Sequence, residues 1–397
     1  MKLACLVTLV GLLSFHGSQA REIRVGADVK TIAAAIKVAQ PGDTIHLEPI
    51  VYRDYAGFYG KKGEPDRPVT LDGHGATLEG SDPLDPARWK EVAPGLFAAV
   101  DLLPRLDEAI LGRWFFLMNG KMTRMGRTSK GRSAALKQPE DLQPGEWTFV
   151  KDPSREAPST KQIVGTFFLK LAPGRQLSEE NIYLPVRSAG VQMSGDNAHL
   201  VIKNLTATHA YNDGFNIHGD CRNVVFQNIR AIECGDDGIS AHESAQYRVD
   251  GLVSVRNSTG ICDTGTAETS YDRVFIAECV GVDLYFLDEG RYSLTNSVVL
   301  SSAQNSLLIT GRAQGECRMQ MENVLIRRSV TPNSGSVAQR AFLNAKRCTF
   351  ENMGVKVTGV ALWEDCRVNG RSMPEETNAI GAALDQLTTL IPEADKP

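Results

Sequence analysis

The sequence lacks an apolar run long enough to cross a membrane, and it lacks a strong excess of either charge. Its first apolar run, Leu3–Leu13, falls short of the about 20 residues that a spanning helix needs, and no later run approaches that length. The formal net charge is -4, which gives no reason to expect an anionic membrane or nucleic acid as partner. We therefore expect no membrane span and no nucleic-acid partner.

The sequence also lacks the C-x-x-C spacing that is typical of zinc and redox sites. Once Cys5 is set aside as part of an N-terminal leader, an odd number of cysteines remains. Four of them open similar short segments (C-R-N-V, C-R-M-Q, C-T-F-E and C-R-V-N), namely Cys221, Cys317, Cys348 and Cys366. We expect them to be buried free thiols in stacked positions; disulfide bridges are the alternative.

The first twenty residues have the features of a secretory signal. Lys2 gives the positive start, Leu3–Leu13 the short apolar run, and Ser18-Gln19-Ala20 a small-x-small cleavage site. We expect residues 1–20 to be removed and the mature chain to be secreted into an extracellular or periplasmic space.

A repeat with a period of 24 residues runs through Asn197–Glu243 and organises the chain. The matched pairs are Val201 with Val225, Asn204 with Asn228, Asp213 with Asp237, Gly214 with Gly238, and His218 with His242. Each half holds β-branched and aromatic runs, turn residues and no helical period. A repeat of this length with short apolar strands is typical of a solenoid. The sequence therefore predicts an all-β fold, a single-stranded parallel β-helix.

The remaining segments are expected to flank or interrupt this solenoid. Residues 21–80 are predicted to form the first coils and a capping helix, because T-I-A-A-A-I-K-V-A within Ala27–Gln40 spaces apolar residues like an amphipathic helix. The predicted segments are 21–80 for this cap, 81–178 for a β-rich insertion, 179–370 for the coils and 371–397 for a tail. Within the tail, Asn378–Leu390 is predicted to form an amphipathic helix.

The insertion is expected to contain two strand pairs and a basic loop. The pairs are Trp114–Met118 with Lys121–Met125, and Trp147–Val150 with Thr166–Leu171. The loop carries five cations and no acid: Lys121, Arg124, Arg127, Lys130 and Arg132. Such a loop is either a solvated surface or a clamp for an anionic sugar chain.

Strand alternation places polar residues on one outer face of the coils. In the strand Gly238–His242, Ile239 and Ala241 must face the core, so Ser240 and His242 face outward. With strands at Gly190–Ser194, Gly214–His218, Gly238–His242, Gly260–Thr264, Gly281–Tyr285 and Ser306–Thr310, two outward columns are predicted. One is Gln192, Asn216, Ser240, Cys262, Asp283 and Leu308. The other is Ser194, His218, His242, Thr264, Tyr285 and Thr310.

Carboxylates gather at the turns before these strands. Asp213 and, one coil on, Asp236 and Asp237 lie next to the columns, while Glu243 follows a strand end. Stacked carboxylates repel, so at least one should have a raised pKa. A protonated carboxyl beside an ionised one is what glycosidic cleavage requires. The plainer interpretation is structural, because N-D-G and G-D-D-G are also good turn sequences.

Two stretches resemble known families. The opening T-I-A-A-A-I-K-V-A-Q-P-G-D-T-I-H-L, followed by a tyrosine and R-P-V-T-L-D-G, resembles secreted proteins of the pectin-lyase superfamily. That resemblance implies a right-handed parallel β-helix, in a superfamily of polysaccharide lyases, polygalacturonase-type hydrolases and alginate epimerases. The stretch L-M-N-G-K-M-T-R-M-G-R is similar to a β-rich insertion of some glycoside-hydrolase-like β-helix proteins.

The aspartate doublet carries the second resemblance. Asn212-Asp213-Gly214 and, one coil later, Gly235-Asp236-Asp237 are similar to the N-T-D and G-D-D motifs of polygalacturonase-type (family 28) hydrolases. The resemblance implies Asp213, Asp236 and Asp237 as the catalytic carboxylates. The third motif of that family, G-H-G, has no counterpart, since the next row reads T-G-I-C-D-T, and the closing R-I-K motif is also absent.

Three functions follow. The first is a hydrolase with an inverting-type attack on a secreted, anionic polysaccharide, without a required cofactor. Asp237 or Asp213 would be the general acid, Asp236 would position water, and His242 would tune the acid. The sugar would be bound by Asn216, His218, Asp283, Tyr285, Arg187 and Arg127.

The second function is a lyase or epimerase acting on a uronate polymer. A Ca²⁺ ion held by Asp213, Asp237 and Glu243 would neutralise the sugar carboxylate, and Arg187 or Tyr285 would take the proton. The third is a non-catalytic, glycan-binding β-helix.

Overall fold

The computed structural model describes residues 19–373 except 104 and 313–314. The predicted signal segment lies almost entirely outside the described residues, and the predicted helix Asn378–Leu390 lies wholly outside them. No helix within the described part of the chain is both long and apolar enough to cross a membrane.

A short helix covers the N-terminal end of the solenoid. Helix α1 (Ile32–Val38) begins after Thr31, whose side chain accepts a hydrogen bond from the backbone N–H of Ala34 at 3.1 Å. Its inward residues Ile32, Ala35 and Ile36 are buried in the main core. The predicted capping helix is therefore confirmed.

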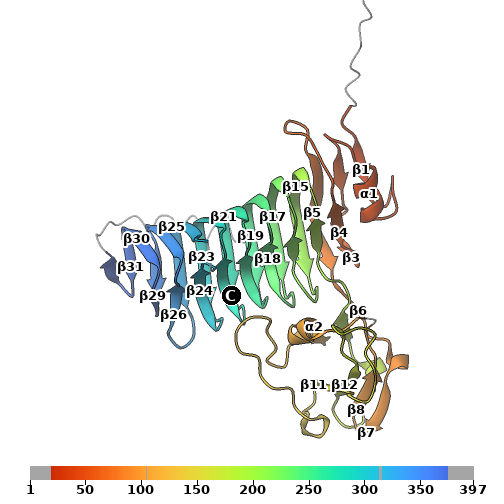
Figure 1. Ribbon diagram of the computed structural model, residues 1–397. Helices are drawn as coiled ribbons and strands as arrows, with labels where there is room; N and C mark the ends of the chain where they lie inside the picture. The colour runs from red at the N-terminus through yellow and green to blue at the C-terminus, as the bar shows by residue number, and fades with distance from the viewer. Residues whose placement is uncertain (1–18, 104, 313–314, 374–397) are drawn as a thin grey trace, which may run out of the picture.

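The coils stack into two long sheets with parallel neighbours (Figure 1). The larger sheet, with 15 strands, contains β1 (Glu22–Arg24), β2 (Thr44–His46), β3 (Val51–Tyr52), β5 (Val69–Glu79), β15 (Ala198–Thr208), β17 (Arg222–Ile232), β19 (Gln246–Val255), β21 (Glu268–Ala277), β23 (Arg291–Ser301), β25 (Cys317–Arg328), β27 (Ala341–Lys346), β28 (Thr349–Glu351), β30 (Val360–Glu364), β31 (Cys366–Val368) and β32 (Arg371–Met373). Its last pair, β31 with β32, is antiparallel.

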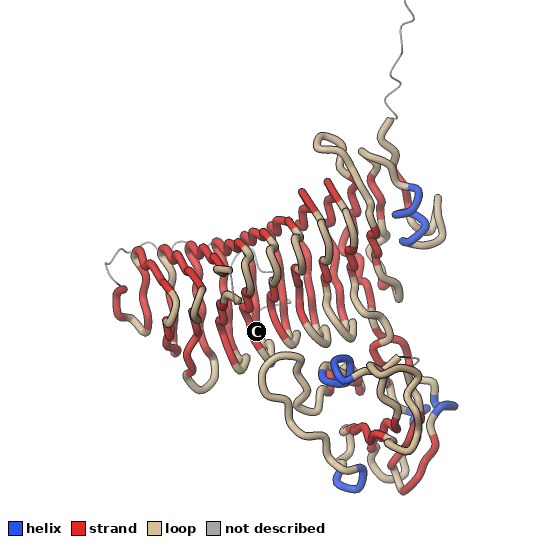
Figure 2. Tube along the Cα trace, in the orientation of Figure 1, coloured by secondary structure: helices blue, strands red, loops and turns tan. Residues whose placement is uncertain are grey.

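The second sheet has nine strands and is called the site sheet below. It contains β4 (Ala56–Tyr59), β14 (Val191–Ser194), β16 (Phe215–Ile217), β18 (Asp237–Ala241), β20 (Thr259–Asp263), β22 (Val282–Leu287), β24 (Asn305–Thr310), β26 (Asn333–Val337) and β29 (Met353–Val357). Successive strands along the solenoid alternate between the two sheets, so each coil contributes to both (Figure 2). The right-handed parallel β-helix that the repeat and the pectin-lyase resemblance imply is confirmed, with about 14 turns.

The predicted repeat is also the register of the structure. Val201 pairs with Val225, and Phe215 pairs with Ile239, so residues 24 apart stack on one another. Apolar residues of each coil fill one continuous core. All seven cysteines from Cys221 to Cys366 are free and buried, as expected.

The insertion folds as a small unit beside one edge of the solenoid (Figure 1). One antiparallel sheet contains β6 (Ser81–Pro83), β9 (Phe116–Met118), β10 (Lys121–Thr123) and β13 (Ile182–Pro185); the other contains β7 (Lys90–Ala93), β8 (Leu96–Val100), β11 (Trp147–Lys151) and β12 (Gly165–Lys170). Helix α2 (Glu108–Gly112) and three 3₁₀ turns, Pro86–Arg88, Pro139–Asp141 and Leu177–Glu179, complete it. Both predicted strand pairs, β9 with β10 and β11 with β12, are confirmed.

The predicted outward columns are wrong beyond Cys262. Ser240 pairs with Cys262 as expected, but Cys262 then pairs with Tyr285, so Tyr285 takes the place predicted for Asp283. The prediction matched Gly281 to Gly260, whereas the strand register stacks Asp283 on Gly260. The Asp283 side chain is therefore buried inside the coil, fully inaccessible.

Candidate active site

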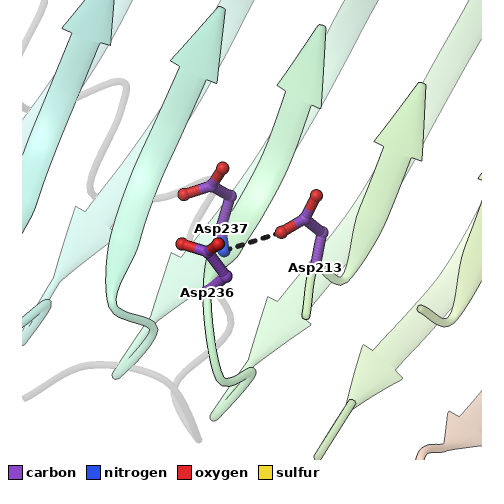
Figure 3. A group of neighbouring side chains, drawn as sticks. All are labelled: Asp213, Asp236 and Asp237. Carbon is purple, nitrogen blue, oxygen red and sulfur yellow. Dashed lines mark hydrogen bonds between the residues drawn. The ribbon is translucent and has the colours of Figure 1, made fainter. Parts of the chain in front are cut away.

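Three aspartates meet at one edge of the site sheet (Figure 3). Asp213 lies just before β16, Asp236 just before β18, and Asp237 is the first residue of β18. Stacking of the two coils lets the backbone N–H of Asp237 donate to Asp213 Oδ1 at 3.0 Å. One oxygen from each carboxyl group lies within 4.8 Å of the others, and the three residues are only 2%, 6% and 3% exposed. This carboxylate trio is the cluster that the sequence predicts.

The insertion supplies the cations that face the trio. Lys130 Nζ lies 2.6 Å from Asp236 Oδ1 and 2.5 Å from Asp237 Oδ1. Arg113 Nη1 lies 2.9 Å from Asp236 Oδ2, and Ser129 Oγ donates a short hydrogen bond to Asp236 Oδ1. Lys130 thus pairs with the chain's own carboxylates, an arrangement that neither interpretation of the basic loop anticipated.

Neighbouring contacts hold the basic loop on the solenoid. Arg124 donates to the carbonyl oxygens of Gly235 and Arg256, at 3.0 Å each, and to that of Cys234. The backbone N–H of Arg132 donates to Gln304 Oε1 at 2.6 Å. The loop therefore closes over the trio as a cover that carries one of its counter-ions.

The trio combines one strongly acidic carboxyl group with two weakly acidic ones. Burial alone would raise the pKa of Asp236, but Lys130 and Arg113 outweigh it and hold that pKa far below its usual range. Burial and the charge of Asp236 raise the pKa of Asp213 to about 6. The same two causes raise the pKa of Asp237 and outweigh its contact with Lys130. An ionised carboxylate therefore lies beside groups that retain protons more readily.

A polar row runs along the site sheet from the trio. Ser240 Oγ donates to Asp213 Oδ2 at 2.7 Å and to Asn216 Oδ1 at 3.3 Å. Asn216 Nδ2 donates in turn to Gln192 Oε1 at 3.1 Å. Tyr285, two coils beyond Ser240, is half-buried, and burial together with Cys262 raises its pKa.

The two predicted histidines stack next to this row. The rings of His218 and His242 are 4.0 Å apart and parallel to within 1°. Burial and the nearby His218 lower the pKa of His242 to about 4, so its ring is neutral near neutral pH. Glu243 accepts hydrogen bonds from His218 and from the backbone N–H of Gly219. The predicted cation set includes Glu243, whereas the carboxyl groups that lie together among the described residues are those of Asp213, Asp236 and Asp237.

Three other predicted substrate residues lie away from the trio. Arg187 precedes Tyr211 by one coil, as expected, but its guanidinium pairs with Asp82 at 2.8 Å. Arg127 donates to the carbonyl of Ala134 at 2.9 Å, and Asp283 lies inside the coil. In the described parts of the chain, none of Arg187, Arg127 and Asp283 has a hydrogen bond or ion pair with the trio.

Sequence reasoning missed Arg113, Ser129 and the pairing role of Lys130. Lys130 was visible as part of an acid-free basic loop, but its partners lie 106 and 107 residues away. Arg113 and Ser129 belong to no motif or period that could have pointed to the trio.

No protein-family model and no curated protein sequence matches this chain. Among solved structures it is similar to a complex of XylC with xylose (12% identity, 83% of this chain and 67% of that one, TM-score 0.47) and to pectate lyase Pel9A (11% identity, 90% and 82%, TM-score 0.46). It is also similar to a family 28 exopolygalacturonase of Yersinia enterocolitica (14% identity, 89% and 80%, TM-score 0.33).

Proposed function

We propose that the protein is a secreted enzyme that hydrolyses glycosidic bonds of an anionic polysaccharide at the carboxylate trio. One observation carries the proposal: three buried carboxyl groups lie within 4.8 Å of one another, with Asp236 held ionised and its neighbours inclined to keep a proton. Glycoside hydrolysis needs such a pair, one carboxyl protonating the leaving oxygen and one activating water.

Asp237 is the proposed general acid, because its raised pKa keeps a proton for the departing sugar oxygen. Asp236, ionised, would orient or deprotonate the attacking water. Asp213 accepts hydrogen bonds from the Asp237 backbone N–H and from Ser240, and would help to position Asp237. The neutral ring of His242 and the hydroxyl of Tyr285 would bind sugar hydroxyls.

Substrate entry requires Lys130 to leave the trio. Its ammonium draws Asp236 and Asp237 together, and the nearest oxygens are closer than the about 6.5–9.5 Å that lets water enter between the carboxyl groups of inverting enzymes. An acidic group on the sugar would compete for the same ammonium. Binding of an anionic residue would thus release Asp237 and retain Lys130 as a substrate contact, while Arg113 stays paired with Asp236 and continues to favour its ionised form.

A metal-assisted lyase is the second candidate, favoured by the closeness of the three carboxylates. Hard cations such as Ca²⁺ take carboxylate oxygens as ligands, and Ca²⁺ would stabilise a sugar carboxylate. The donors fit such an ion in kind, but Lys130 already supplies the countercharge. Lys130 would have to move before Ca²⁺ could bind.

The two reactions leave different products. The chain lacking residues 1–20 is incubated with acidic and neutral polysaccharides, with and without a chelator, and both reducing ends and the absorbance of unsaturated uronates are followed. Reducing ends without unsaturation, unaffected by chelator, are expected. Unsaturated products that vanish with chelator would replace the hydrolase with the lyase, and binding without any product would indicate the glycan-binding function.

A further inference from the structure

Two exposed tyrosines stand at the N-terminal end of the site sheet. In β4, Ala56 and Phe58 point into the core and are buried, so the alternate residues point outward. Tyr55 is 40% exposed and Tyr59 is 62% exposed. Large aromatic side chains on one open face are unusual without a partner, because their apolar area is better removed from water.

Gly57 brings the two rings together. A Cβ atom on Gly57 would lie 2.7 Å from a ring carbon of Tyr59 and 2.9 Å from a ring carbon of Tyr55. Both rings therefore fold over the bare backbone of Gly57 and form one continuous aromatic surface, called the tyrosine platform here. A side chain at position 57 would push the rings apart.

The strand register places this platform in line with the active-site residues. Gly57 pairs with Gln192, which pairs with Asn216, and Asn216 pairs with Ser240. Coils stack at about 4.8 Å, so the platform lies about 10 Å from Asn216 along the axis of the solenoid. A short oligosaccharide lying along the site sheet would touch both.

Positive charge surrounds the platform. A pocket of about 460 Å³ between β4 and the C-terminal end of α1 is lined by Tyr55, Tyr59, Lys37, Lys61 and Lys62, with no acidic residue in its lining. Lys62 pairs with Asp196 at 2.5 Å, and Lys61 Nζ donates to the carbonyl of Ala39 at 2.9 Å. The exposed ammonium of Lys37 has no ion-pair partner among the described residues.

We propose that the tyrosine platform and Lys37 form a subsite for an acidic sugar residue of the polysaccharide whose chain reaches the trio. The apolar C–H face of a sugar ring would stack on the tyrosines, and its carboxylate would meet the lysines. The proposal rests on the proposed function for its substrate chain, and it adds the residues that bind that chain away from the bond that is cleaved.

Electrophoresis in native gels that contain dissolved polysaccharide tests the subsite by binding alone. All variants carry Asp237→Asn so that the probe is not consumed, and the probes are polygalacturonate and a neutral xylan. Tyr59→Ala and Tyr55→Ala are expected to weaken binding of polygalacturonate by roughly tenfold each, the effect of losing a well-packed aromatic contact. Tyr59→Phe, which keeps the ring, should bind as the parent does, and Lys37→Gln should weaken only the acidic probe.

The control is Leu362→Ala, which removes an exposed apolar side chain from β30 at the other end of the solenoid. Thermal melting of each variant shows whether it is folded. Unchanged binding by folded Tyr55→Ala and Tyr59→Ala variants, or no binding of either probe by the parent, would overturn the subsite. Equal losses for both probes in Lys37→Gln would overturn its acidic specificity. Turnover measured with Asp237 intact decides the proposed hydrolase separately.

Discussion

Replacement of Lys130 by methionine tests whether the basic loop is held on the trio by charge. The side chain keeps its length but loses the ammonium that lies 2.6 and 2.5 Å from two carboxylates. Lys130, Asp236 and Asp237 are all largely buried, and removing one partner of a buried ion pair typically costs about 3–5 kcal/mol. Proton uptake by the carboxyl groups that lose their contact with Lys130 offsets part of that cost. We expect the free energy of unfolding to fall by about 3 kcal/mol near neutral pH.

The sign of the pH dependence follows from Asp236. Its pKa is depressed in the folded protein, so its contribution to stability is present above the unfolded value of 3.8 and is lost as the pH falls through the folded pKa. Without Lys130 that pKa rises and the contribution shrinks. The difference between wild type and Lys130→Met should therefore be largest near pH 7 and should shrink only as the pH falls below 3.8 toward the folded pKa of Asp236.

Urea unfolding followed by tryptophan fluorescence measures this difference in stability for the insertion, which carries Lys130. Trp89, Trp114 and Trp147 lie in the core of the insertion, so the signal reports mainly on that unit. Lys137→Met is the matched control on the same insertion, because Lys137 pairs with Glu146 at the surface and such pairs contribute about 0–1 kcal/mol. Equal losses for the two variants near neutral pH, or a gap that widens as the pH falls below 3.8, would refute the reasoning.

Three further outcomes are expected. Burial lowers the pKa of His209, but hydrogen bonds with Glu233 and Glu79 outweigh burial and raise this pKa to about 9. The protonated ring then stabilises the fold by about 3 kcal/mol below the unfolded pKa of 6.5, and this stabilisation is lost as the pH rises through 9. Melting temperatures of wild type should therefore decline over that pH range, and those of His209→Gln should not. Asp263, fully buried, accepts hydrogen bonds from Tyr247, Tyr271, Thr269 and the backbone N–H of Ala241. Asp263→Ala removes the shared acceptor of these buried donors and should destabilise by about 3 kcal/mol in urea, against little change for exposed Asp196→Ala. The chain without residues 1–20 should show no thiol reactive to Ellman's reagent when native and seven when unfolded; fewer than seven would indicate a disulfide.

The repeat made the trio predictable. Because each coil matches the next over 24 residues, Asp213 and Asp237 had to stack, and the outward positions of Ser240 and His242 followed from alternation. Matching coils by their glycines failed at Asp283. The prediction paired Gly281 with Gly260, whereas Asp283 is the residue that stacks on Gly260. A glycine indicates a turn, and turns of different length shift it relative to the strand.

Contacts between distant segments could not be predicted in this way. Lys130 and Arg113 reach the trio because the insertion docks on the solenoid, and no period in the sequence records that docking. The outward Tyr-x-Gly-x-Tyr alternation of Tyr55–Tyr59 is visible in the sequence. Its place on the site sheet depends on β4 pairing with β14, which follows it by more than a hundred residues.

The central claim is that the trio performs acid–base catalysis, and Asp237→Asn tests it most directly. Steady-state hydrolysis of an acidic polysaccharide is compared for wild type, Asp237→Asn and Asp250→Asn, a control on the larger sheet whose carboxylate pairs with Arg273. Loss of the general acid should lower kcat by about 10²–10⁴-fold with little change in KM or in melting temperature. A folded Asp237→Asn protein that keeps the turnover of Asp250→Asn would contradict the account.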